Sequence, residues 1–189
     1  MELLLQDIAQ AVQVMQDGGI ILYPTDTVWG IGCDATNEAA VAKIFALKKR
    51  NDSKKMITLV ASERDILQYV TQPDLELFNY LAAANQPTTV IYEDVIGLAN
   101  NLIDANGSAA IRICQDSFCR HLIKRLQRPI VSTSANLSGM TTPSCFADIH
   151  ATIIHGVDYV VQHRRDDSNM NSPSAIIEWS KDGQPIIIR

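Results

Sequence analysis

A chain of 189 residues has room for one domain or two small ones, and its 47% hydrophobic and 20% charged residues are typical of a globular protein. This composition excludes a disordered chain, a collagen and a disulfide scaffold. Sixteen Lys and Arg against 21 Asp and Glu give a net charge of −5. Any site for a polyanion therefore has to be local rather than spread over the surface.

The N-terminus and the cysteines point to a cellular compartment. The opening stretch MELLLQDIAQ has neither the basic start nor the long apolar run of a signal peptide, and no stretch approaches the roughly 18 apolar residues of a membrane span. The cysteines are Cys33, Cys114, Cys119 and Cys145, and no two of them form a CxxC pair. We therefore expect a cytoplasmic protein with free thiols, with a zinc site at Cys119 and His121 as the alternative.

Hydrophobic periodicity predicts alternating helices and strands in the N-terminal half. Apolar residues recur at helical spacing from Ile8 to Met15, and Gly18 and Gly19 end that helix. The short apolar run at 20–23 then predicts a buried strand. The elements expected next are a helix after Asn37, a strand over 56–60, a helix around 66–70 that Ser62 caps and a helix over 75–81.

The same alternation continues in the C-terminal half. The expected elements are strands over 88–92 and 109–113, a helix over 118–126, a strand at 130–131, and closing strands over 159–162, 174–179 and 185–189. Polar loops are expected at Ser132–Gly139 and His163–Pro173, and the second is the best candidate for a mobile loop because it has no apolar period. Strands that alternate with helices predict one α/β domain over residues 1–189 with a mixed sheet.

Five of the sixteen basic residues fall within eight positions, in the stretch Lys48-Lys49-Arg50-Asn51-Asp52-Ser53-Lys54-Lys55. This stretch joins the end of a predicted helix to the start of a predicted strand. One interpretation is a solvated charged loop whose cations favour the helix C-terminus. The other is a clamp for phosphate, because arginine supplies a planar fork of donors and lysine a mobile point charge.

Two further polar stretches each follow an apolar strand. They are Tyr23-Pro24-Thr25-Asp26-Thr27-Val28-Trp29-Gly30 and Ser132-Thr133-Ser134-Ala135-Asn136-Leu137-Ser138-Gly139. One interpretation is that their polar groups face a crevice at the end of the sheet and bind anionic oxygens there. The other is that both are turns that bond their own backbone. The chain has no Walker loop, no G-x-S-x-G elbow and no H-E-x-x-H motif.

The order and spacing of these stretches resembles that of the YrdC-like family. Gly18 to Asp34 resembles the family's opening segment, and Lys48-Lys49-Arg50 resembles its K-x-R motif, with Lys54 in the place of a further lysine. Ser134-Ala135-Asn136 resembles its S-x-N motif, and the similarity runs on to Arg189. The resemblance implies the short, single-domain form of the family, with an open, twisted mixed sheet, flanking helices and a basic concave cavity.

The resemblance also implies an activity, that of threonylcarbamoyl-AMP synthase. Such an enzyme joins L-threonine, bicarbonate or CO2, and ATP, releases pyrophosphate, and needs Mg²⁺ only as the ion carried with ATP. A separate tRNA threonylcarbamoyl transferase complex would use the product, so we expect weak or indirect contact with tRNA and none with a membrane. The alternatives are a non-catalytic RNA-binding module and a family paralogue that uses another acyl donor.

Residue by residue, the resemblance implies two catalytic residues and two sets of substrate contacts. The implied catalytic residues are Lys48 and Arg50. The implied ATP contacts are Arg50, Lys54, Ser108, Ser134, Asn136, Thr142 and Arg189. The implied threonine contacts are Thr27, Arg112, Ser132 and Ser174.

The chain departs from the family pattern in four places. Residues 84–89 keep only part of a W-P-G-P-x-T motif, and the stretch at 113–116 lacks the usual proline and histidine. Asn51 stands where proline commonly follows the arginine, and Ala175 replaces a threonine. These differences concern the fit of the substrates more than the fold.

Overall fold

Nine strands in the described part of the chain form one sheet, in the order β7-β1-β2-β6-β3-β5-β4-β8-β9. The protein is represented by a computed structural model that describes residues 2–49, 56–167, 172–180 and 182–189. The strands are β1 (Ile21–Tyr23), β2 (Gly30–Gly32), β3 (Ile57–Val60), β4 (Thr88–Tyr92), β5 (Ala109–Ile113), β6 (Ile130–Ser134), β7 (Tyr159–Val160), β8 (Ala175–Trp179) and β9 (Pro185–Ile187).

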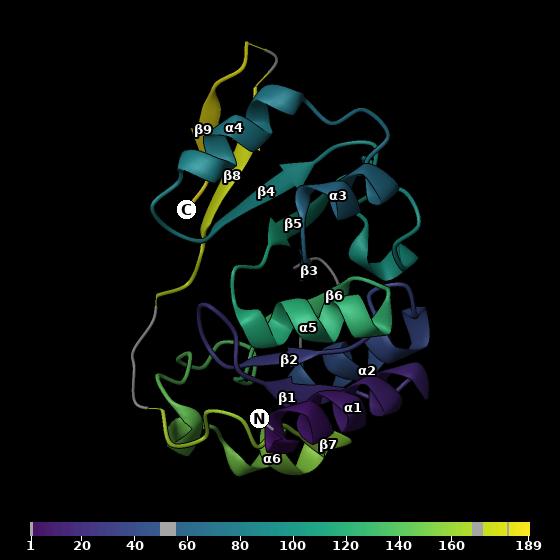
Figure 1. The fold of residues 1–189 in the computed structure, drawn as a ribbon, viewed down its shortest axis with the longest axis vertical. Helices are drawn as coiled ribbons and strands as arrows, with labels where there is room; N and C mark the ends of the chain where they lie inside the picture. Colours follow the sequence, from purple (N-terminus) through teal and green to yellow (C-terminus); the bar gives the residue numbers. More distant parts are fainter. Residues whose placement is uncertain (1, 50–55, 168–171, 181) are drawn as a thin grey trace.

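The sheet is mixed. The pairs β1–β7, β3–β5 and β4–β8 are parallel, and the other neighbours are antiparallel. The helices are α1 (Glu2–Gln16), α2 (Glu38–Lys48), α3 (Glu63–Tyr69), α4 (Leu75–Ala83), α5 (Ser117–Leu126) and α6 (Ala151–Gly156), with 3₁₀ turns at Asn100–Leu102 and Phe146–Asp148. The predicted open, mixed α/β sheet with flanking helices is confirmed (Figure 1).

Two clusters of buried apolar residues cover the two faces of the sheet. On one face, α1 and α5 pack over Ile21, Tyr23, Leu59 and Ile130, and Figure 1 shows these two helices side by side. On the other face, α2, α3, α4 and α6 pack over a larger cluster that includes Ile111. The helical spacing from Ile8 to Met15 faces the first cluster, as the sequence predicts.

Strand alternation places polar residues on the face of the sheet that α1 and α5 partly cover. Ile111 belongs to the cluster under α2, so its neighbour Arg112 points to the opposite face. Arg112 is in register with Leu59, which packs under α5. Ser132 lies two residues beyond Ile130 on β6 and shares its face. Because α1 and α5 cover only part of this face, Arg112 and Ser132 remain available to form a site.

Three segments differ from the elements expected from the sequence. Strand β2 at Gly30–Gly32 was not predicted; its two glycines let it pair closely with β1 and β6. Strand β6 continues to Ser134, so the polar loop begins later than expected. The helix Ala151–Gly156 was missed because its six residues are too few to show a period.

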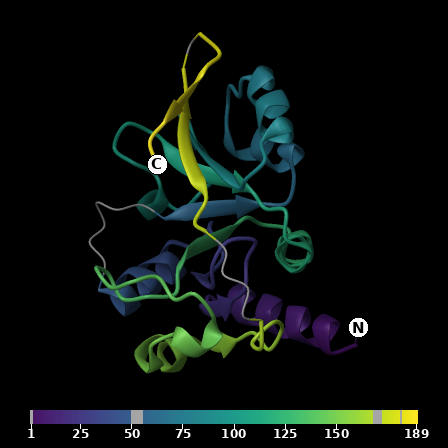
Figure 2. The same cartoon turned by 90° about the vertical axis from the view of Figure 1, so that its left-hand side faces the viewer.

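Strands β7 and β8 are consecutive in the chain, but β7 forms one edge of the sheet and β8 lies next to β9, the strand at the other edge. Figure 2 shows the two strands far apart along the long axis of the molecule. Part of the predicted mobile loop lies here: residues 163–166 form a turn, and 168–171 lie outside the described residues. Across the described helices, none has the length and apolar character needed to cross a bilayer.

Candidate functional site

A cavity of about 180 Å³ opens on the face of the sheet that α1 and α5 leave uncovered. Residues from seven separate stretches of the chain line it, and seven of these residues are predicted substrate contacts. The lining residues are Thr27, Val28, Met56, Ile57, Arg112, Ser132, Thr133, Ser134, Thr142, Pro173, Ser174, Ile176 and Arg189. Two of these residues are basic and none is acidic, so this part of the wall is positively charged.

Arg112 is the buried charge of this cavity. Its side chain is 2% exposed, and its Nη2 lies 2.9 Å from Oδ1 of Asp26, which is 9% exposed. The approach is close enough for an ion pair but does not have hydrogen-bond geometry, so Asp26 Oδ1 stays without a hydrogen bond among the described residues. The Arg112 Nε also has no partner in that part of the chain. The guanidinium therefore keeps an N–H group available for an anionic ligand.

A hydroxyl chain fixes the turn that carries Thr27. The Thr25 hydroxyl donates to the carbonyl of Val28 at 2.7 Å and accepts from the Thr27 N–H at 3.0 Å. The two threonine hydroxyls are 3.0 Å apart, and Arg112 Nη1 donates to Thr27 Oγ1 at 3.3 Å. Since the Thr25 proton is used by Val28, Thr27 is the donor of the pair. The turn thus bonds its own backbone and also faces the cavity, so both sequence interpretations apply to it.

Glycine in β2 is required by the close approach of β6 and Tyr23. A Cβ on Gly32 would lie 2.4 Å from the carbonyl oxygen of Val131 and 2.6 Å from Tyr23 Cε1. The buried Tyr23 hydroxyl donates to that same carbonyl at 3.0 Å, and burial raises the pKa of Tyr23 well above its usual value. A Cβ on Gly30 would lie 3.2 Å from Ser132 Oγ. Glycine at position 30 thus leaves room beside the Ser132 hydroxyl.

A β-bulge turns Arg189 into the cavity. The N–H groups of Ile188 and Arg189 both donate to the Ile176 carbonyl, at 2.8 and 3.2 Å, and Ile176 N–H donates back to Arg189 at 3.0 Å. Two residues therefore oppose one, an arrangement that changes the direction of the side chains at the bulge. Arg189 Nη2 donates to the Ser174 carbonyl at 3.2 Å, and the buried Ser174 hydroxyl lies 2.8 Å from Thr89 Oγ1.

Lys48 and Asn136 do not line the cavity but hold the loop behind it. The Lys48 side chain is 1% exposed, and its Nζ donates to the carbonyls of Ser134 and Asn136, the latter at 2.6 Å. The Asn136 amide donates to the carbonyls of Leu137 and Met140, at 2.9 and 2.7 Å. These bonds give both side chains a role inside the protein. The substrate contacts expected of Lys48 and Asn136 stay predictions.

Of the remaining predicted contacts, Ser108 lies in the described part of the chain. Ser108 follows the alternation of Ala110 and Arg112, so its side chain lies on the cavity face of the sheet. Its hydroxyl donates to Asn106 Oδ1 at 2.8 Å, and it is not among the lining residues. Arg50 and Lys54 lie outside the described residues. The nucleotide contacts expected of these three side chains stay predictions.

Comparison with known proteins identifies the family. A family model described as "Telomere recombination", covering Sua5, YciO and YrdC, matches residues 13–189. The chain belongs to the Sua5/YciO/YrdC family. Two relatives named threonylcarbamoyl-AMP synthase are similar to it. The protein from Idiomarina loihiensis is 33% identical over 76% of this chain and 78% of its own length, and that from Pseudoalteromonas translucida is 30% identical over 82% and 84%.

Several solved structures share the fold of this chain. Pyrococcus abyssi Sua5 in complex with L-threonine superposes with a TM-score of 0.84 at 21% identity, over 96% of this chain and 53% of that one. E. coli YciO gives 0.81 at 21% identity, over 96% and 87%. A full-length HypF in its phosphate- and nucleotide-bound form gives 0.82 at 18%, over 97% and 28%. This chain therefore spans about half of the Sua5 chain that it resembles.

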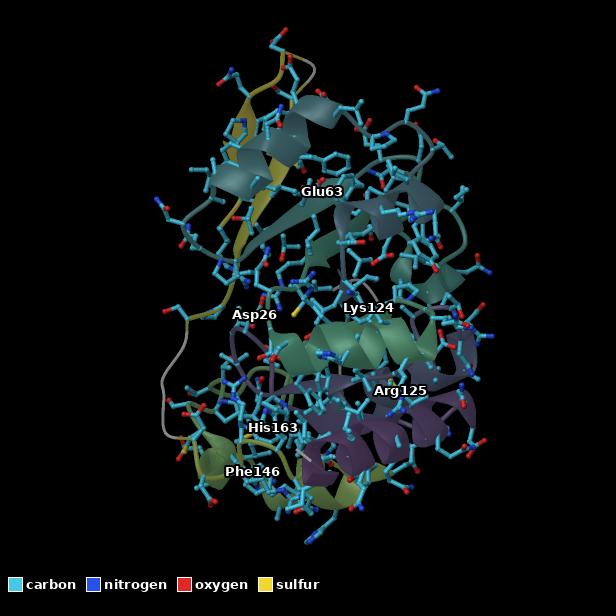
Figure 3. All side chains as sticks on the ribbon, in the orientation of Figure 1. Asp26, Glu63, Lys124, Arg125, Phe146 and His163 are labelled. Carbon is cyan, nitrogen blue, oxygen red and sulfur yellow. The ribbon has the colours of Figure 1, made fainter. Side chains whose placement is uncertain are left out.

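Two contributors to the site in this member of the Sua5/YciO/YrdC family were missed by sequence reasoning. Asp26 lies beside the start of α5 (Figure 3), where the N–H of Gln115 donates to its Oδ2 at 3.2 Å. Arg164 Nη1 lies 2.9 Å from Asp116 Oδ2 and donates to the Thr25 carbonyl at 3.4 Å. The carboxylate of Asp26 was visible within its motif, but its pairing with Arg112 joins positions 86 residues apart. Nothing in the local sequence distinguishes Arg164 from a solvated loop arginine.

The zinc alternative receives no support. Among the residues that the structure describes, no group of three or more His, Cys, Asp and Glu side chains is arranged to hold a metal. The Cys119 thiol is buried, donates to the Pro24 carbonyl at 3.3 Å, and has a raised pKa because of that burial. His121 is exposed, and its Nδ1 lies 2.6 Å from the Ser117 carbonyl. Cys119 thus behaves as a core side chain.

Proposed function

We propose that this protein is an L-threonylcarbamoyladenylate synthase that works as one unit over residues 1–189. Its relatives with that name are similar over most of both chains. The observation that carries the proposal is the convergence on one cavity of the buried Arg112 and the hydroxyls of Thr27, Ser132 and Ser174. One cation and several hydroxyls are the groups that a hydroxylated amino acid requires.

Threonine binds in this proposal with its carboxylate on Arg112. The unpartnered Nε–H group supplies one donor, and movement of Nη2 from Asp26 to the ligand supplies the second donor of a bidentate pair. The three hydroxyls contact the polar end of the amino acid. A volume of about 180 Å³ is below the roughly 300–1,000 Å³ of pockets for drug-sized ligands and suits one amino acid.

ATP lies in this proposal along the side of the cavity formed by Ser134, Thr142 and Arg189. Arg189 offers a charged fork for phosphate oxygens, and Ser134 stands at the open end of β6. Arg50 and Lys54, outside the described residues, complete the phosphate contacts that the family motif implies. Mg²⁺ enters as part of the MgATP substrate, held by phosphates and water.

The reaction needs two bond-forming steps. The threonine amine adds to CO2, or to bicarbonate with loss of water, and gives a carbamate. A carbamate oxygen then attacks the α-phosphorus of ATP, the bond between the α-phosphorus and the bridging oxygen breaks, and pyrophosphate leaves. Both reactants are anions, so the basic wall acts by bringing them together and aligning them rather than as a nucleophile.

The product then serves tRNA modification. In this proposal a separate tRNA threonylcarbamoyl transferase complex takes threonylcarbamoyl-AMP and transfers its acyl group to adenosine. The synthase itself works in the cytoplasm and touches tRNA weakly or indirectly.

Pyrophosphate release tests the proposal. The purified protein is supplied with MgATP, and L-threonine and bicarbonate are omitted in turn, while ¹⁴C-bicarbonate follows the carbamoyl carbon. We expect pyrophosphate and labelled adenylate only when all three are present. Pyrophosphate release that needs another acyl donor would identify the paralogue, and tight tRNA binding without turnover would identify the RNA-binding module; either result overturns the proposal.

A further inference from the structure

Lys48, the first residue of the K-x-R motif, is hydrogen-bonded to Ser134 and Asn136 of the S-x-N motif. We propose that Lys48 is a positioning residue, which holds the segment Ser134–Ser138 in the shape that presents Ser134 to the cavity. It acts from the protein side of the loop and does not contact the reacting atoms. The substrate arms of its test rest on the proposed function, and the exchange arm does not.

Lys48 is bonded to the loop through both its side chain and its backbone. Its Nζ donates to the carbonyls of Ser134 and Asn136, the latter at 2.6 Å. Its own carbonyl accepts from the N–H of Ser138 at 2.9 Å. Lys48 is the last residue of α2, and the left-handed cap at Lys49 ends the helix there. One residue thus connects the end of a helix to the last residue of β6 and to two residues of the loop that follows it.

Burial explains why a lysine is needed for this role. The side chain is 1% exposed, so its ammonium has left bulk water and depends on acceptors that the protein supplies. Carbonyl oxygens of an irregular loop also need donors, because no regular ladder satisfies them. An apolar residue of similar length would fill the space and leave these carbonyls without this donor.

The segment that Lys48 holds adjoins both the proposed threonine contact Ser132 and the proposed ATP contact Ser134. Ser132 and Ser134 are two residues apart on β6, and both line the cavity. A loosened loop therefore weakens binding of threonine and of ATP together. A Lys48 that touched the phosphates directly would instead affect ATP and the rate of the chemical step.

The first arm measures binding and turnover in Lys48→Met. The matched control is Lys43→Met, since Lys43 lies on the same helix and its Nζ also donates to a backbone carbonyl, that of Gly18 at 2.7 Å, but away from the cavity. Calorimetry gives the Kd of ATP and of threonine separately, and pyrophosphate release gives kcat. We expect both Kd values to rise about tenfold or more in Lys48→Met, kcat at saturation to stay within about threefold, and Lys43→Met to match the wild type.

The second arm follows amide hydrogen exchange without substrates. We expect the amides of residues 135–140 to exchange about tenfold faster or more in Lys48→Met, while those of α5 keep their wild-type rates. Ser138→Pro removes the N–H that donates to the Lys48 carbonyl at an exposed position, and we expect it to weaken both ligands in the same way. This variant carries the test if Lys48→Met does not fold.

The two arms separate the outcomes. Unchanged exchange with loss of ATP binding alone, or a collapse of kcat with unchanged Kd values, would show that Lys48 contacts substrate and overturn the inference. Unchanged exchange and unchanged affinities would overturn it too. If the wild-type protein makes no threonylcarbamoyl-AMP, the exchange rates still decide whether Lys48 holds the loop, so failure of the proposed function is distinguished from failure of this inference.

Discussion

At the scale of single residues, the site depends on the buried guanidinium of Arg112, one N–H group of which has no hydrogen-bond acceptor among the described residues. Arg112 is paired with Asp26 and bonded to Thr27, yet its Nε has no partner among the described residues. Burial of a charge is tolerated when a counter-charge and hydrogen bonds accompany it. Asp26 provides that counter-charge, and in the proposed function the carboxylate of threonine takes its place.

Replacement of Arg112 by lysine tests the need for a fork of donors. Arg112→Lys keeps the positive charge but cannot present two parallel N–H groups to a carboxylate. We expect the KM for threonine to rise about 10- to 100-fold, corresponding to the loss of one strong charged hydrogen bond, with the Kd for ATP nearly unchanged. Steady-state kinetics with each substrate varied in turn gives both values. Arg120→Lys on α5 is the control, and equal threonine KM values in the two variants would remove Arg112 from the carboxylate site.

The hydroxyls around Arg112 predict an order of amino-acid substrates. A site built to bond a hydroxyl rejects an analogue that lacks it, whereas one missing methyl group costs less, about 10–200-fold. We therefore expect 2-aminobutyrate to be used about 10³-fold less well than threonine or worse, and serine to fall between the two. Competition assays of pyrophosphate release rank the three compounds. A ranking in which 2-aminobutyrate exceeds serine would contradict the placement of Thr27, Ser132 and Ser174 at the threonine hydroxyl.

At the scale of elements, the close contact between β2, β6 and Tyr23 depends on a glycine. Gly32→Ala places a Cβ 2.4 Å from the Val131 carbonyl oxygen, and neither that backbone nor the buried Tyr23 ring has room to move. We expect a loss of about 1–3 kcal/mol in the free energy of unfolding, the usual effect of overpacking. Urea denaturation measures it. Gly30→Ala is the comparison: its Cβ meets the Ser132 hydroxyl at 3.2 Å, so we expect a smaller stability loss and a higher KM for threonine. The reverse order would contradict this account.

The sequence predicts elements well where packing follows a period and poorly where it depends on partners. The run from Ile8 to Met15 is fully determined by its helical spacing, and β5 by its apolar composition. Strand β2 was not predictable, because a three-residue strand with two glycines has too few apolar residues to show a period and pairs only when β1 and β6 are beside it. The same holds at the site: the motifs supplied Thr27 and Arg112, but the Asp26–Arg112 pair and the inward turn of Lys48 arise from contacts distant in sequence.

At the scale of the whole molecule, charge limits what the protein can hold beyond its cavity. The net charge is −5, so the surface as a whole repels a polyanion. Apart from the basic stretch at 48–55, a local exception is α5 and its end, where no acidic residue separates Arg120, Lys124, Arg125 and Arg128. Lys124 and Arg125 are both exposed on that helix, and Figure 3 labels them. Arg128 is already paired with Asp34 at 2.6 Å, which leaves three cations of this group for other contacts.

These counts predict weak binding of bare tRNA with a shallow dependence on salt. Each neutralised phosphate contributes about −0.7 to −0.9 to the slope of log Kobs against log salt, so three contacts give a slope of about −2 to −3. We expect a Kd above about 1 μM at physiological salt, within the range of non-specific binding. Fluorescence anisotropy with labelled tRNA between 50 and 200 mM salt measures both quantities, and the double variant Lys124→Gln/Arg125→Gln should flatten the slope by about two contacts. Nanomolar binding with a slope steeper than about −5 would require a larger basic surface than the described residues offer and, without turnover, would favour the RNA-binding module over the synthase.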